Sequence, residues 1–196
     1  PELSFFQKAQ YAFVIGCEFL IKGIRLTDIS NHSLFGTAST GIYPCPVTIL
    51  SQSGWRMPQL TAKQDEQLAT TPTEDLLKLE LLQPENIKYT LHAYQLAKRC
   101  NEKRVMAQSV EWGKRGARLN AIAPGIIVTP LAIDEFNGIR GDFYKNMFAK
   151  CPAGRPGTAD EVANVAELLM SDKGAFITGS TFLIDGGATA SYFYGP

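Results

Sequence analysis

The sequence predicts an α/β fold with a parallel sheet flanked by helices. From residue 47 onward, short apolar runs alternate with helix-length segments, which is how parallel strands are connected. The runs are rich in β-branched residues and carry little polar character, as strands do when helices cover both faces of a sheet. These two observations favour a parallel sheet over a sandwich or a helix bundle.

The first half of this region predicts one strand and three helices. VTILS (47–51) is a short apolar run typical of a buried strand. In the polar region 59–90, TAKQ (61–64) and TPTE (71–74) both match a capping box, with Pro72 as the first helical residue, so two short helices are expected. A long helix is predicted from Leu91 to Glu111, because WGKRG follows with glycines and basic charge.

The second half predicts two more strands with a helix between them. ARLNAIAPG (117–125) is expected to be a strand that ends at Pro124–Gly125, and AFITGSTFLIDGG (175–187) a final strand closed by a turn. GTADEVANVAELLM (157–170) predicts a helix with a capping box at Thr158 and Glu161 and an apolar stripe at helical spacing. Residues 1–46 are less informative: YAFVIG (11–16) favours a strand and SLFGTA (33–38) part of a helix.

Composition excludes several functional classes. The chain has 196 residues, 45% hydrophobic and 19% charged, with a formal net charge of zero. It is long enough for one domain with a core, and its charge argues against nucleic acid or a membrane surface as partner. Four scattered cysteines without C-x-x-C indicate reduced thiols in a cytoplasmic protein, with no metal site. The apolar stretch 11–24 contains Glu18 and Lys22 and is too short to span a bilayer.

The segment HAYQLAKRC (92–100) places Tyr94 and Lys98 four positions apart on the predicted long helix, so their side chains lie on one face. A phenol has a pKa of about 10 and is a poor base at neutral pH. An ammonium about 4 Å away contributes roughly 4 kcal/mol at an effective dielectric constant of about 20, enough to lower a pKa by about three units. Lys98 could therefore make Tyr94 a usable acid/base, although the spacing alone also fits two ordinary residues on an exposed helix face.

Further motifs stand on both sides of this helix. A serine ends the strand before it, an N-x-x-x-P-G-x-x-x-T pattern follows it, and an I-T-G…D-G-G pattern closes the chain. The residues concerned are Ser51, Tyr94, Lys98, Asn120, Pro124, Gly125, Thr129, Ile177, Thr178, Gly179, Asp185, Gly186 and Gly187. In this order the motifs resemble those of the short-chain dehydrogenase/reductase family over about residues 47–190, which implies a Rossmann-like sheet.

The resemblance implies an enzyme that uses NAD or NADP to interconvert a secondary alcohol and a ketone. Tyr94 would exchange a proton with the substrate oxygen, and Ser51 would hydrogen-bond that oxygen. Lys98 would hold the nicotinamide ribose and lower the pKa of Tyr94. Ser53 is the alternative to Ser51, which is preferred because it stands at the strand end.

The resemblance also assigns cofactor contacts to the segment after the second strand. The backbone around Pro124, Gly125 and Ile127 and the hydroxyl of Thr129 would meet the nicotinamide amide and the phosphates. No acidic residue is identifiable as the one that would bind the 2′-hydroxyl of the cofactor ribose. The sequence therefore does not choose between NAD and NADP.

The family's glycine-rich turn, T-G-x-x-x-G-x-G, is absent: Gly16 and Gly23 are separated by bulky residues, which gives no close backbone approach to a pyrophosphate. We therefore expect one domain (1–196) with an atypical or truncated cofactor-binding part (1–46) and a catalytic part (47–196). The favoured explanation is a piece of a longer enzyme, because a two-strand remnant would expose a sheet edge. The alternative is a non-catalytic relative that serves as an oligomeric or binding module and lacks the dinucleotide-binding turn.

A second departure is the long segment between Ser51 and Tyr94. It is similar in placement to the helical insertion of some bacterial hydroxysteroid dehydrogenases, and should border the substrate side or alter the subunit interface. A solvated surface excursion is the alternative. The family's fourth catalytic residue, an asparagine, maps onto Ser33, with Asn31 two positions away, and stays unassigned.

Residues 130–157 are expected to form a loop, with Gly138 and Gly141 as hinges, that carries five large apolar side chains: Phe136, Phe143, Tyr144, Met147 and Phe148. In the family this region closes over the substrate, which predicts a lid and an apolar substrate; core packing is the alternative. His92 leaves the helix on another side than Tyr94 and is expected to be structural. The aromatic tail SYFYGP fits a contact with another subunit, because members of the family are usually homodimers or homotetramers.

Overall fold

The computed structural model describes residues 45, 47–139 and 141–195, with Leu131 described by its backbone alone. The strand predicted at 11–16 and the helix predicted at 33–38 lie outside these residues, as do Asn31 and Ser33.

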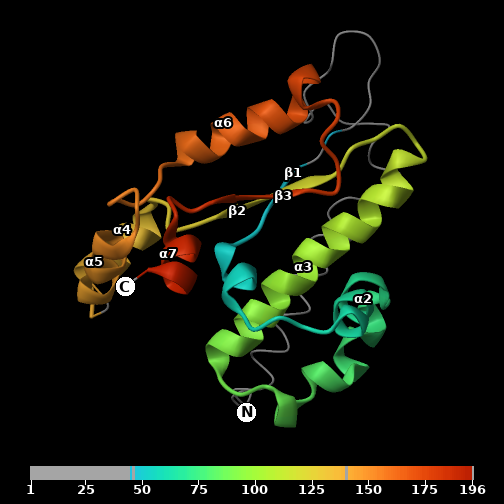
Figure 1. Cartoon of the computed structure of the whole chain (residues 1–196), viewed down its shortest axis with the longest axis horizontal. Coiled ribbons are helices and arrows are strands. Elements are labelled where there is room, and N and C mark those ends of the chain that lie inside the picture. Colours follow the sequence, from blue (N-terminus) through green and yellow to red (C-terminus); the bar gives the residue numbers. More distant parts are fainter. Residues whose placement is uncertain (1–44, 46, 140, 196) are drawn as a thin grey trace.

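A parallel sheet forms the centre of the described chain, as predicted. It consists of β1 (Val47–Ile49), β2 (Asn120–Pro124) and β3 (Thr181–Ile184), in the order β1-β2-β3. Ile49 pairs with Ile122, which in turn pairs with Phe182. All five residues of β2 are buried, because a strand lies on each side of it and helices cover both faces (Figure 1).

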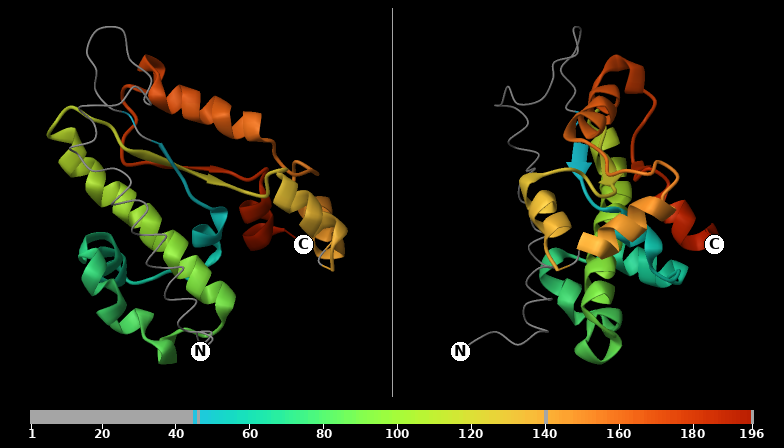
Figure 2. Two further views of the ribbon diagram at one scale, coloured as in Figure 1. Left: turned by 180° about the vertical axis from the view of Figure 1, so that it is seen from behind. Right: turned by 90° about the vertical axis from the view of Figure 1, so that its left-hand side faces the viewer.

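Helices lie on both faces of this sheet. α6 (Ala159–Met170) runs along one face, and α3 (Thr90–Gly113) crosses the other (Figures 1 and 2). α4 (Pro130–Asn137) and α5 (Gly141–Lys150) lie beyond one end of the sheet, η6 (Asp172–Gly174) follows α6, and α7 (Ala188–Tyr194) follows β3. None of the described helices is long and apolar enough to cross a membrane.

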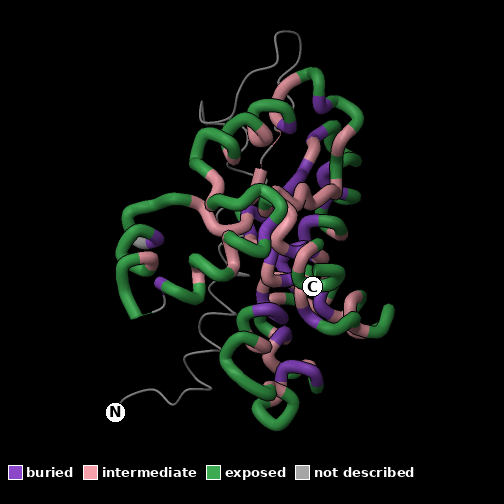
Figure 3. The backbone as a smooth tube through the Cα atoms, turned by 60° about the vertical axis from the view of Figure 1, so that its left-hand side comes forward, coloured by how far each residue is buried: buried purple, intermediate pink, exposed green. Residues whose placement is uncertain are grey.

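The long helix α3 packs against two separate groups of apolar side chains. Its C-terminal half meets the sheet through Val105 and Trp112, which share a buried cluster with Leu50, Leu119 and Ala121. Its N-terminal half contributes Leu96, Ala97 and Cys100 to a second buried cluster. The tube in Figure 3 shows the buried residues gathered along the middle of the molecule, with exposed segments around them.

The second cluster is the core of the segment between Ser51 and Tyr94. This segment folds into α2 (Ala62–Thr70), η3 (Thr73–Lys78), η4 (Glu80–Leu82) and η5 (Pro84–Asn86). Its buried apolar residues are Met57, Leu68, Leu76, Leu81 and Leu82. Because they pack directly on α3, the insertion is a docked substructure, and the interpretation as a solvated excursion is wrong.

Of the two capping boxes predicted in the insertion, one forms. The Thr61 hydroxyl accepts from the Gln64 amide at 3.2 Å, and the Gln64 side chain accepts from the Thr61 amide at 3.0 Å. The box at Thr71–Glu74 was wrong, because Thr71 instead ends α2, its amide donating to Gln67. Pro72 then precedes a 3₁₀ helix without a side-chain cap.

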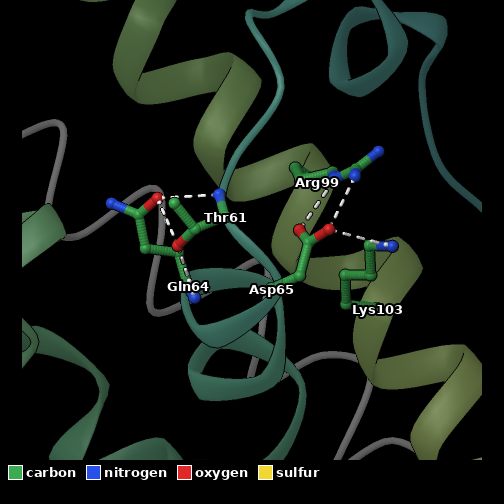
Figure 4. A network of polar contacts seen from close by, with 5 residues as sticks. All are labelled: Thr61, Gln64, Asp65, Arg99 and Lys103. Carbon is green, nitrogen blue, oxygen red and sulfur yellow. Dashed lines mark hydrogen bonds and ion pairs between the residues drawn. The ribbon is translucent and has the colours of Figure 1, made fainter.

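Ion pairs also hold the insertion on α3 (Figure 4). Asp65 accepts from Arg99 at 3.0 and 2.8 Å, one hydrogen bond to each carboxylate oxygen, and lies 3.1 Å from the Lys103 ammonium. Farther along α3, Arg104 donates to the carbonyls of Leu68 and Thr71 at the end of α2. The insertion is thus fixed by polar contacts at both ends of α2 and by its apolar core between them.

The third strand is shorter than the sequence predicts. Residues 177–180 are irregular and precede β3; here the Asn120 side chain donates to the Ile177 carbonyl at 2.8 Å and accepts from the Ser180 amide at 3.1 Å. Gly179 has a φ of +68° and lies against Ser109 of α3, a conformation and a distance that exclude a side chain. The I-T-G motif therefore directs the chain into β3.

Candidate active site

Ser51 stands where β1 leaves the sheet. The ladder continues one residue past the strand, since the Leu50 amide donates to the Ile122 carbonyl at 2.7 Å. Ser51 then caps η2 (Gln52–Arg56): its hydroxyl accepts from the Ser53 amide at 3.2 Å and lies 3.3 Å from the Ser53 hydroxyl. Both serines are half-buried. The two alternatives for the catalytic serine are therefore neighbours, and the preference for Ser51 stays a prediction.

A glycine sets η2 directly on α3. A Cβ built on Gly54 would lie 2.9 Å from the amide nitrogen of Arg99 and 3.1 Å from the carbonyl carbon of Lys98. Only a residue without a side chain allows this approach. The segment that begins at Ser51 consequently lies against the turn of α3 that carries Lys98.

Tyr94 and Lys98 lie on one face of α3, as their spacing predicts. The Lys98 ammonium lies 5.3 Å from the centroid of the Tyr94 ring, in a cation–π arrangement. The side of α3 on which Tyr94 lies is open, and 45% of Tyr94 is exposed. The phenol is thus accessible and lies beside an ammonium, and proton transfer by Tyr94 stays a prediction.

The residues predicted to contact the cofactor follow β2. Gly125 donates its amide to Ile184 at 3.0 Å and packs on Asp185 so closely that a Cβ would lie 2.8 Å from the Asp185 Cα. Ile127 lines a cavity of about 250 Å³ that Asp185 and Gly186 also border. Thr129 caps α4, its hydroxyl accepting from the Ala132 amide at 3.1 Å, which leaves the hydroxyl hydrogen for another acceptor.

The fold brings these two groups of residues to the same edge of the sheet. β1 and β2 are parallel neighbours, so Ser51 and Pro124 leave the sheet on the same side. Ligands of parallel α/β sheets bind at this carboxyl edge. Within the described residues no hydrogen bond links Ser51 or Tyr94 to the segment 124–129.

The loop predicted at 130–157 is wrong for most of its length, because α4 and α5 form there. The five large apolar residues of the predicted lid do not form a core. None of them is buried, and Phe143 is 63% exposed. Instead Phe136 of α4 packs edge-on against Tyr144 and Phe148 of α5, at ring distances of 5.3 and 5.4 Å. The interpretation as core residues is wrong, and closure of α4 and α5 over a substrate stays a prediction.

Two charged residues near the site were missed by sequence reasoning. Glu102 lies one helical turn beyond Lys98 and is only 6% exposed; burial raises its pKa to about 7. Glu102 follows Tyr94 and Lys98 at four-residue intervals, so helical spacing could have placed it near the candidate site. Arg56 ends η2, and burial lowers its pKa against the influence of Asp185; no motif marks it. The Nδ1 of His92 accepts from the Lys88 amide at 3.3 Å, and the structural role expected for His92 stays a prediction.

Comparison with known proteins defines the class. The parallel sheet with α3 and α6 on its faces is a Rossmann-like fold, and a family model described as enoyl-(acyl carrier protein) reductase matches residues 61–189. The chain belongs to the short-chain dehydrogenase/reductase family. The resemblance inferred from the motifs is thereby confirmed.

Curated relatives share moderate identity over part of their length. A short-chain dehydrogenase/reductase, bsc3, of Alternaria brassicicola is 38% identical over 125 residues, covering 64% of this chain and 45% of that protein. D-threitol dehydrogenase of Mycolicibacterium smegmatis is 42% identical over 81 residues, covering 41% and 30% respectively. The chain thus spans less than half the length of these relatives.

Solved structures support the same fold. A 3-alpha-hydroxysteroid dehydrogenase from Pseudomonas sp. B-0831, complexed with NADH, superimposes with a TM-score of 0.59 at 27% identity, covering 75% of this chain and 56% of that one. A 4-hydroxyisoleucine dehydrogenase complexed with NADH gives a TM-score of 0.62 at 23% identity, covering 96% and 61%. The second likeness shows the fold alone.

Proposed function

We propose that this chain carries the catalytic part of an NAD(P)-dependent oxidoreductase that interconverts a secondary alcohol and a ketone. The observation that supports this most directly is the docking of η2 on α3. Gly54 packs on the backbone of Lys98 and Arg99, so a serine hydroxyl, a phenol and an ammonium come from two elements in contact. The relatives named as dehydrogenases support the same reaction class.

The residues present fit the nicotinamide end of a dinucleotide. Lys98 offers three N–H donors, suited to ribose hydroxyls, and Thr129, two residues after Ile127, retains a hydroxyl donor. Gly125 keeps the backbone there free of side-chain bulk. When bound, the cofactor supplies or accepts the hydride.

The protein's own contribution is to place and stabilise the proton transfer. Tyr94 gives a proton to the ketone oxygen during reduction and takes it back during oxidation. The Lys98 ammonium, held over the Tyr94 ring, keeps a positive charge beside the phenol. Ser51 donates a hydrogen bond to the substrate oxygen and stabilises the charge that develops on it.

The lid helices define the surroundings of the substrate. The rings of Phe136, Tyr144 and Phe148 pack together beyond the carboxyl edge of the sheet. An apolar portion of a small substrate would lie against this aromatic group when α4 and α5 close. The substrate we propose is therefore a secondary alcohol or ketone with an apolar body.

A titration and one substitution test this function. NADH and NADPH are titrated into the chain while nicotinamide fluorescence is followed, and turnover of secondary alcohols is measured for wild type and Tyr94→Phe. We expect cofactor binding in both proteins and a loss of at least about 10²-fold in turnover in Tyr94→Phe. Tyr89→Phe, an exposed tyrosine five residues earlier, is the matched control and should retain turnover. Absence of cofactor binding would instead favour a non-catalytic family relative.

A further inference from the structure

We infer that Arg56 binds a carboxylate on the substrate, so that the substrate is a hydroxy or oxo acid with an apolar body. This inference rests on the proposed function, because it assigns the substrate class of the same site. It starts from two buried nitrogen atoms of Arg56 and from the position of η2 in the fold.

The guanidinium of Arg56 is enclosed but incompletely paired. Its Nε and Nη2 atoms are buried and have no hydrogen-bond partner among the described residues. Its Nη1 atom lies 3.9 Å from the sulfur of Met147 on α5, and its central carbon lies 5.8 Å from the ring centroid of Tyr192 on α7. A sulfur atom and a ring face are weak partners for a buried cation.

The two unpaired nitrogens are the pair that recognises a carboxylate. The N–H bonds of Nε and Nη2 point in parallel and match the two oxygens of one carboxylate group. The same chain shows this geometry at Arg99, whose Nε and Nη2 donate to the two oxygens of Asp65 at 3.0 and 2.8 Å. Arg56 presents the same pair of donors without such a partner from the described chain.

Asp185 is the acidic residue of the described chain whose charge acts on Arg56, and it is already engaged. Its carboxylate accepts from the amides of Gly187 at 2.9 Å and Thr189 at 2.7 Å, which fixes the start of α7. No ion pair joins it to Arg56 among the described residues, although its charge contributes at longer range. The Nε–Nη2 pair of Arg56 is therefore left for a ligand.

The position of Arg56 suits a substrate group remote from the reacting carbon. Ser51 caps η2 and Arg56 is its last residue, which corresponds to about 10 Å of 3₁₀-helical rise. Figure 1 shows η2 beside α7, at the end of the sheet where α4 and α5 also lie. A substrate held at its oxygen by Ser51 would place an acid group several bonds away toward Arg56.

Access requires α5 to move, and its packing permits this. Gly141 is the single buried residue of α5, so displacing this helix exposes little additional apolar surface. Opening of α5 withdraws Met147 from the guanidinium and lets a carboxylate approach. Closure would then return the lid over the bound acid.

Calorimetric titration without cofactor tests the inference independently of catalysis. The probes are 5-hydroxyhexanoate and its methyl ester, which share a secondary alcohol and differ in the acid group. We expect wild type to bind the acid about 10- to 100-fold more tightly than the ester. Arg56→Gln should abolish this preference, and Arg56→Lys, which keeps the charge but not the paired donors, should lose most of it. Arg115→Gln, at an exposed arginine beyond the end of α3, should retain it.

The outcomes separate this inference from the proposed function. Equal binding of acid and ester by wild type, binding of neither, or an unchanged preference in Arg56→Gln overturns the carboxylate site. Arg56-dependent binding of the acid without any NAD(P)-dependent oxidation supports the carboxylate site and counts against the proposed reaction. Thermal unfolding of each variant verifies its fold, and Arg56→Lys provides the comparison where Arg56→Gln unfolds.

Discussion

Gly54 and Arg99 touch through their backbones: a Cβ on Gly54 would lie 2.9 Å from the Arg99 amide nitrogen. This contact joins the segment that starts at Ser51 to the helix that carries Tyr94 and Lys98. The relative position of three groups assigned to the reaction therefore depends on a residue that has no side chain.

Replacing this glycine should disturb both stability and activity. In Gly54→Ala the new methyl group meets helix backbone that cannot move aside, so we expect a loss of about 1–3 kcal/mol in the free energy of unfolding and a lower kcat/KM. Urea unfolding and steady-state kinetics measure the two effects. Gly113→Ala is the control, because nothing lies within 4 Å of a Cβ at the end of α3. Equal effects of the two substitutions would contradict the packing argument.

The two neighbouring serines can be distinguished by separate substitutions. If Ser51 hydrogen-bonds the substrate oxygen, Ser51→Ala should lower kcat by about 10²–10³-fold, whereas Ser53→Ala should lower it by less than about 10-fold. Ser51→Ala also removes the cap of η2, with a stability loss of about 1 kcal/mol. Kinetics at a temperature well below unfolding separate the two effects. The reverse order of kinetic losses would assign the role to Ser53.

Glu102 should make stability depend on pH near neutrality. Burial raises its pKa from 4.5 to about 7, with Arg99 and Lys103 lowering it and Asp65 raising it. Between these two values the folded state holds a proton that the unfolded state has lost. Stability should therefore fall as pH rises from about 4.5 to about 7, by at most about 3 kcal/mol.

Glu102→Gln tests this dependence, because the amide keeps the shape and removes the titration. The variant should be more stable than wild type at pH 8 and nearly equal to it at pH 4.5, as measured by urea unfolding. Glu111→Gln, at an exposed position on the same helix, should show no such pH-dependent difference. A constant difference across this range would show that Glu102 does not titrate there.

Asp65 should hold the insertion on α3 until the solution becomes acidic. Burial alone would raise its pKa, but hydrogen bonds from Arg99 and Lys103 outweigh this and keep the pKa below its ordinary value of 3.8. The stabilisation is thus present above that value and is lost as pH falls through the lowered pKa.

Asp65→Asn should reduce the free energy of unfolding by about 1–3 kcal/mol at pH 7, and the difference should vanish in strong acid. Urea unfolding at several pH values measures this loss. Asp75→Asn provides the control, because the Asp75–Lys78 pair is exposed and such pairs contribute about 0–1 kcal/mol. If the two variants lost equal stability, the ion pairs on α3 would have no special role.

The sequence predicted the three strands of the described sheet, the long helix α3 and the helix α6 well, because those depend on local patterns, whereas α4, α5 and α7 were not predicted. The strand at 47–49, the helix at 90–113 and the cap at Thr158 follow from apolar periodicity and capping chemistry. The second capping box failed because the same Thr71 was needed to end α2. The Thr71 carbonyl also accepts from Arg104, 33 positions away in sequence, a contact that no local pattern contains.

The candidate site was predictable only where a motif carries it. Tyr94 and Lys98 were found from helical spacing, and Ser51 from its place at a strand end. Arg56 was missed because its environment is made by Met147 and Tyr192, which reach it through tertiary folding.

The two apolar clusters on α3 pack its two halves against different parts of the molecule. Its far half rests on the sheet, while the half with Tyr94 and Lys98 is braced by the insertion and by η2. A shortened chain without the insertion would leave that half of α3 without packing partners on this side, with Leu96, Ala97 and Cys100 exposed to solvent. An engineered variant that lacks the insertion would therefore need polar residues in place of the exposed apolar ones on α3. Substitutions in the insertion would in turn shift the half of α3 that carries Tyr94 and Lys98.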